Sequence, residues 1–132
     1  MKHIFLILLC TYYRGATYCI DENNPKMKVG NGMTLGNFIQ IKDPGSVTGN
    51  IDNYIQTSCN GLYLHEYGHT IQSRHYGLAY LFNIGIPSII SAAGNGEHCQ
   101  KWFERQASRY AKYYFGPSIW TPTIDLYHPT NR

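Results

Sequence analysis

The chain of 132 residues has the length of one domain, so no second domain is expected. Apolar residues make up 43% of it and charged residues only 14%, which provides a hydrophobic core and excludes a disordered polyelectrolyte. The formal net charge of +3 is spread without a run of like charges, and this argues against a dedicated nucleic-acid binder.

The first fourteen residues resemble the start of an exported protein only in part. Lys2 is followed by an apolar run at residues 4–9, as in a secretory signal, but the run is short and no small residues of a cleavage site follow it. We expect residues 1–14 to be a signal segment or, as the favoured alternative, a first strand or a truncated chain start. Elsewhere the longest uncharged run, 77–96, contains polar residues and glycines, so no membrane span is expected.

Strands are expected in the turn-rich first half of the chain. Residues 17–20 are a short strand candidate, and residues 33–41 are a stronger one. In the latter, one predicted face carries Leu35, Ile39 and Ile41, and the other carries Thr34, Phe38 and Gln40. Residues 43–46 indicate a turn.

Helices are expected in the second half. The first spans residues 62–76 and ends at Gly77 in a left-handed cap. Two short apolar helices follow at 78–84 and 87–93, and a long one at 97–115. The two halves together predict an α+β fold, with residues 15–116 as the folded domain and 117–132 as a C-terminal tail.

The four cysteines do not form a recognisable motif. None lies at CxxC spacing, so neither a zinc knuckle nor a redox motif is present. Buried free thiols are favoured over a disulfide for Cys10, Cys19, Cys59 and Cys99, and the redox compartment stays open.

The most informative residues are His65-Glu66-Tyr67-Gly68-His69, an HExxH motif inside the first predicted helix. Histidines four residues apart project from one helix face, so both imidazoles can reach a single Zn²⁺. Glu66 is rotated by ~100° from His65 and is expected beside the metal, as a general base toward a zinc-bound water. The alternative is two solvated histidines on an exposed helix face.

Gly68 is unusual in the middle of a helix, where it costs about 1 kcal/mol relative to alanine. Its missing side chain would allow another backbone to approach the two histidines, although a merely tolerated weak position is the alternative.

A catalytic zinc needs a third protein ligand and an open position. Glu104 is the favoured candidate, because it falls on the flank of the apolar side of the last helix, beside small residues. Five other groups are considered. His75 is discarded for its spacing, and His98 is expected to point toward the basic face of the last helix. The remaining three stay open: Glu97, Asp125 and His128.

At these residues the sequence resembles the gluzincin metallopeptidases, in which two histidines of HExxH and a later glutamate hold the metal. It is similar to a zincin-like domain of bacterial secreted and RHS-repeat-associated proteins over residues 15–115. The segments that carry this resemblance are 15–17, 33–39, 65–73, 77–81, 85–92 and 102–104, with Ala107 and residues 114–115.

The resemblance implies His65, His69 and Glu104 as zinc ligands and Glu66 as the catalytic glutamate. The expected activity is hydrolysis of peptide or related amide bonds, with an extended peptide added to the edge of strand 33–41. The oxyanion donor stays open among Tyr110, Tyr114, Tyr127 and His128. Two alternatives are a non-catalytic metal or peptide-binding module and a toxin-like effector domain that needs a carrier protein.

Overall fold

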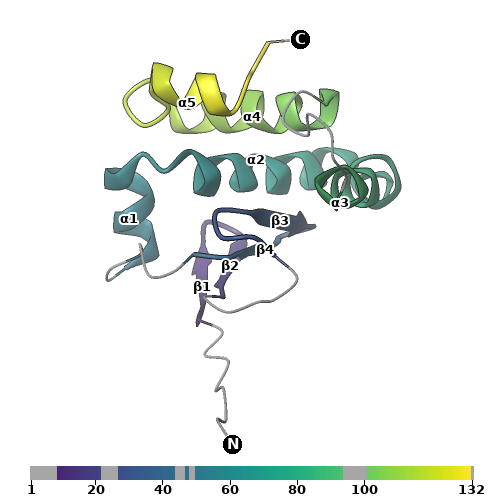
Figure 1. Ribbon diagram of the computed structural model, residues 1–132, viewed down its shortest axis with the longest axis horizontal. Helices are drawn as coiled ribbons and strands as arrows, with labels where there is room; N and C mark the ends of the chain where they lie inside the picture. The colour runs from purple at the N-terminus through teal and green to yellow at the C-terminus, as the bar shows by residue number, and fades with distance from the viewer. Residues whose placement is uncertain (1–8, 22–26, 44–46, 48–49, 94–100, 132) are drawn as a thin grey trace, which may run out of the picture.

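The computed structural model describes residues 9–21, 27–43, 47, 50–93 and 101–131. A small sheet, the long helix α2 (Gly61–Tyr76) and the pair α4 (Trp102–Phe115) and α5 (Pro122–Tyr127) form three layers, with α2 in the middle (Figure 1). The predicted α+β class is confirmed. Among the described residues, no helix has the length and apolar character needed to cross a membrane.

The sheet has four strands in the order β1-β2-β4-β3. They are β1 (Leu9–Tyr13), β2 (Ala16–Ile20), β3 (Gly32–Leu35) and β4 (Phe38–Ile41). β2 and β4 are parallel, and the other two pairs are antiparallel. β3 therefore lies at an edge of the sheet, where it also packs against α2.

The predicted strand at 33–41 is wrong in one respect, because the chain reverses in its middle. A tight turn at Gly36 and Asn37 splits it into β3 and β4, and Gly36 has a φ of 62°, which a residue without a side chain adopts easily. Thr34 pairs with Ile39 in register and is buried, so it faces the core side rather than the opposite face that the alternation predicts.

The expectation of free thiols is wrong for two of the cysteines. Cys10 and Cys19 lie directly opposite each other in β1 and β2 and form a disulfide. Cys59 is a half-buried free thiol, and Cys99 lies outside the described residues. The register that brings the two sulfurs together is a property of the hairpin, which the spacing of cysteines alone does not reveal.

The helices agree with the sequence in the middle of the chain and differ around it. α2 ends at Tyr76 as predicted, and Gly77 is its C-cap with the positive φ of 60° expected of a capping glycine. Its ψ of −136° lies outside the left-handed helical region, so the left-handed cap predicted there is wrong in this respect. α3 (Ile86–Ala93) lies where a helix was predicted. The segment predicted as a helix at 78–84 is also largely helical, with residues 79–80 α-helical and the π-helical segment η1 (Leu81–Gly85) leading directly into α3.

One helix boundary and two short helices differ from the prediction. α4 begins at Trp102 with Lys101 as its N-cap, rather than at residue 97. Residues 97–100 of the predicted helix lie outside the described residues, and so do residues 44–46 of the predicted turn. α1 (Ile51–Ser58) is capped by the Asn50 side chain, and α5 lies within the segment predicted as a tail.

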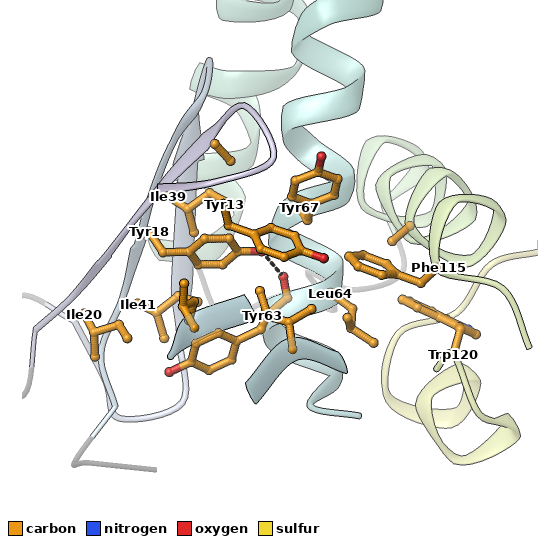
Figure 2. Close-up of a cluster of buried hydrophobic side chains, with 14 of the residues drawn as sticks. Tyr13, Tyr18, Ile20, Ile39, Ile41, Tyr63, Leu64, Tyr67, Phe115 and Trp120 are labelled. Carbon is orange, nitrogen blue, oxygen red and sulfur yellow. Dashed lines mark hydrogen bonds between the residues drawn. The ribbon is translucent and has the colours of Figure 1, made fainter. Parts of the chain in front are cut away.

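The main core fills the space on both sides of α2 (Figure 2). The Tyr18 hydroxyl donates a hydrogen bond to the Tyr63 carbonyl at 2.8 Å, which ties β2 to α2. On the other side, Trp120 and Ile124 are buried with Phe115, so residues 117–131 contribute to the core.

Candidate metal centre

Gly68 sets the distance between the two helices that carry the site. A Cβ at this position would lie 2.0 Å from the carbonyl oxygen of Ala107 and 3.2 Å from the Ala111 Cβ. The backbone of α4 thus occupies the space that a side chain would need, as the glycine within the motif predicts. This close packing brings the motif histidines of α2 near Glu104 of α4.

His65, His69 and Glu104 meet in the interior. Their exposed fractions are only 6%, 3% and 1%. The Nε2 atoms of His65 and His69 lie 2.7 and 3.0 Å from Glu104 Oε2, and one ligand atom from each residue lies within 4.8 Å of the others. The structure therefore brings together the three residues that the sequence singles out as ligands.

The outer nitrogens of both imidazoles are also held. His65 Nδ1 lies 2.8 Å from Ser108 Oγ, and His69 Nδ1 lies 2.7 Å from Gln72 Oε1. The Gln72 amide nitrogen donates to the Phe103 carbonyl, so its oxygen faces His69 and accepts the Nδ1 proton. His69 Nε2 is then free to act as a ligand, as in metal sites whose histidines donate their second N–H to a fixed acceptor.

Electrostatics of the cluster favour a bound cation. Burial alone lowers the pKa of His69, but the Glu104 carboxylate outweighs it and raises that pKa to about 9. Burial likewise raises the pKa of Glu104, yet His69 and His65 outweigh it and hold the carboxyl well below its usual range. Glu104 is thus a buried carboxylate that requires a positive partner, either a protonated histidine or a metal ion.

The donor set fits zinc. Two imidazole nitrogens and one carboxylate oxygen are common zinc ligands, and they leave a fourth position open. Ligands ~2.1 Å from a tetrahedral ion lie ~3.4 Å apart, so Glu104 Oε2 would lie about 0.7 and 0.4 Å further from the Nε2 atoms of His65 and His69 than the present 2.7 and 3.0 Å.

Glu66 lies beside this cluster without being part of it. A cavity of about 250 Å³ is lined by His65, Glu66, Glu104 and Ser108, among others. Glu66 is 4% exposed, and its Oε2 accepts a hydrogen bond from the Thr34 hydroxyl at 2.5 Å. Both carboxylates therefore line the cavity, but Glu104 lies between the two histidines while Glu66 is held by Thr34.

His128 covers His65 from the C-terminal segment. The two rings stack with centroids 4.9 Å apart, and a Cβ on Gly61 would lie 2.9 Å from His128 Cδ2. Burial and the nearby His65 lower the pKa of His128 to about 3, so its ring is neutral. His128 and Tyr127 both line the cavity, which leaves both as candidate oxyanion donors.

The other candidate donors, Tyr110 and Tyr114, have other contacts. Tyr110 packs against His75, and the Tyr114 hydroxyl accepts a hydrogen bond from Arg14.

The remaining candidate ligands lie elsewhere. Asp125 contacts Lys112 and Trp120, and His75 is exposed beside Tyr76. Glu97 lies outside the described residues.

Sequence reasoning missed three residues that hold the site, namely Thr34, Gln72 and Ser108. Ser108 follows Glu104 by one turn and Gln72 follows His69 by three residues, so helical spacing was a usable signal for both. Thr34 had no such signal, because it reaches Glu66 across 32 residues of chain.

Comparison with known proteins gives no relative. No protein family, no curated protein and no solved structure matches the chain. Its function is therefore inferred from its own residues.

Proposed function

We propose that the chain is a zinc-dependent hydrolase of peptide or related amide bonds, with a zincin-like fold of the gluzincin type. The observation that carries this proposal is the buried cluster of His65, His69 and Glu104 beside a cavity that Glu66 also lines. Three neutral or anionic donors and a separate carboxylate are the groups that metal-assisted hydrolysis needs.

The three ligands would hold the ion through His65 Nε2, His69 Nε2 and a Glu104 oxygen. When bound, zinc supplies Lewis acidity toward a substrate carbonyl and a lowered pKa for water. Ser108 and Gln72 fix the ring planes of the two histidines, which keeps the nitrogens directed at one point.

Glu66 is proposed as the general base. Its carboxylate lies in the cavity, accepts the proton of the attacking water and then transfers it to the leaving amine nitrogen. Burial excludes competing solvent from this carboxylate, and its hydrogen bond with Thr34 leaves the second oxygen available for the proton.

A peptide is the proposed substrate because a sheet edge lies next to the cavity. β3 is an edge strand, and its first residue, Gly32, lines the same cavity as Glu66. An extended peptide can pair with such an edge through its backbone and thereby bring one carbonyl to the centre. Tyr127 or His128 can donate to the oxyanion from the opposite wall.

Elemental analysis and a peptide-cleavage assay test the proposal together. We expect about one zinc per chain, lost in His65→Ala and His69→Ala. Glu66→Gln should keep the zinc while the rate falls about 10²–10⁴-fold, because an amide cannot accept the proton. The exposed His75→Ala is the matched control and should keep both zinc and rate.

Two results would contradict parts of the proposal. Full zinc content in both ligand variants would remove the metal assignment. Tight zinc binding without cleavage of any peptide would leave a non-catalytic binding module, and activity dependent on a carrier protein would indicate a toxin-like effector.

A further inference from the structure

The carboxylate of Glu66 is held from outside its own helix. The Thr34 hydroxyl lies 2.5 Å from Glu66 Oε2 and 3.3 Å from the Glu66 carbonyl oxygen. A hydroxyl has only one proton, and the Thr34 hydroxyl donates it to Glu66 Oε2, because the shorter contact to a carboxylate oxygen is the stronger hydrogen bond. Both residues are buried, so this hydrogen bond is largely shielded from bulk water.

A second residue of β3 shapes the same carboxylate. A Cβ on Gly32 would lie 2.7 Å from Glu66 Oε1 and 2.8 Å from its Cδ and Cγ. Residues two apart in a strand face the same side, so Gly32 and Thr34 both face Glu66. Because Gly32 has no side chain, the Glu66 carboxylate can occupy the space beside it, and Thr34 binds one oxygen of that carboxylate.

Thr34 is itself fixed in place. The Tyr80 hydroxyl donates to the Thr34 carbonyl at 3.0 Å, and Thr34 pairs with Ile39 of β4. Burial of Tyr80, with Glu66 and Glu104 nearby, raises the pKa of its phenol, so Tyr80 stays a neutral donor. The Thr34 hydroxyl that bonds Glu66 thus belongs to a residue of β3 that is itself fixed by Tyr80 and by β4.

We infer that Thr34 is the positioning residue for Glu66, with Gly32 providing the room for its carboxylate; this inference rests on the proposed function. Without the Thr34 hydroxyl the carboxylate rotates away from the geometry in which Oε1 receives a proton. The Thr34 hydroxyl contacts Glu66, whereas His65 and His69 contact Ser108, Gln72 and Glu104, so metal binding should not depend on Thr34.

Thr34→Val and Thr34→Ser in the zinc-loaded protein test the inference. Valine keeps the shape but lacks the hydroxyl, so kcat should fall about 10–100-fold, the value of a hydrogen bond to a charged group, while KM and zinc content stay the same. Serine keeps the hydroxyl and should restore most of kcat. Met33→Ala, on the opposite side of β3, is the control and should change kcat less than about threefold.

Gly32→Ala is an independent variant in case valine prevents folding. Its methyl group displaces the carboxylate, so kcat should fall while zinc content is retained. A kcat within about twofold of the parent in both Thr34→Val and Gly32→Ala would overturn the inference. Loss of zinc in Thr34→Val would also overturn it, since a positioning residue for Glu66 leaves the ligands intact.

Failure of the proposed function is recognised separately. If the parent protein binds zinc but cleaves no peptide, the ¹³C carboxyl resonance of Glu66 still reports the hydrogen bond. That resonance should move in Thr34→Val and return in Thr34→Ser. An unchanged resonance in Thr34→Val would show that Thr34 does not hold Glu66, whatever the activity of the chain.

Discussion

Gly68 shows how one missing side chain determines the geometry of the candidate centre. In an isolated helix, Gly68→Ala would be favoured by about 1 kcal/mol. Here the methyl group would meet the Ala107 carbonyl at 2.0 Å, so α4 has to move and the net effect should be a loss of roughly 1–3 kcal/mol. Urea unfolding measures this loss in the free energy of unfolding, with the exposed His75→Ala as the control. An equally stable Gly68→Ala would mean that the helices lie further apart.

Ser108 holds the outer nitrogen of His65 and is itself 1% exposed. Removal of such a partner commonly weakens metal binding 10–100-fold, so Ser108→Ala should lower zinc affinity by about this factor. Competition with a zinc chelator measures the change. Ser118→Ala, at an exposed position, should leave the affinity as it is; an equal loss in both variants would contradict a specific role for Ser108.

At the level of elements, α5 is attached to α4 through Asp125. This carboxylate accepts hydrogen bonds from Trp120 Nε1 at 2.6 Å and Lys112 Nζ at 3.0 Å. Burial raises its pKa, but Trp120 and Lys112 outweigh this and lower it below the ordinary 3.8. The stability it contributes is therefore present above pH 3.8 and is lost as the pH falls through the lower folded-state value.

Asp125→Asn should show this dependence. At pH 7 the variant should lose at most about 1 kcal/mol of its free energy of unfolding, because the ion pair of Asp125 with Lys112 is partly exposed. The difference in the free energy of unfolding from the parent should shrink toward pH 2, as protonation of the parent carboxyl removes its charge. Denaturant unfolding at both pH values measures it, and a difference that grows on acidification would refute the role of Asp125.

The elements that the sequence predicts well are those with a local signal. α2 has helical periodicity and a terminal glycine, so its extent follows from its own residues. The β3–β4 hairpin was missed because residues 33–41 alternate like one strand, although Gly36 lies at the turn. α5 was missed because six residues give little periodicity, and its burial depends on contacts of Trp120 and Ile124 with distant elements.

For the whole molecule, zinc binding should appear as thermal stability. The proposed ligands come from α2 and α4, which an unfolded chain does not bring together, so zinc should bind the folded state preferentially. At a hundredfold excess over Kd the gain is about 2.7 kcal/mol, which should raise Tm by roughly 5–15 °C. Glu104→Ala should show little of this shift. An equal shift in Glu104→Ala would place the ion elsewhere.

The sequence predicts those parts of the candidate site that lie close together along the chain or on one helix. His65, Glu66 and His69 follow from one motif on one helix, and Glu104 was favoured by its place on the flank of another. Thr34 and His128 reach the site through tertiary contacts from β3 and from the segment after α5, and neither is marked by spacing in the sequence. Such contacts depend on the packing of the whole chain.

The position of residues 117–131 has a consequence for how the protein matures. A chain leaves the ribosome from its N-terminal end, so α2 and α4 emerge before Trp120, Ile124 and His128. Until these three residues follow, the core lacks two of its side chains and His65 lacks the ring that covers it. The candidate centre is therefore completed late, after α4 has been synthesised, and in a nascent chain that ends at α4 His65 lacks the cover of His128.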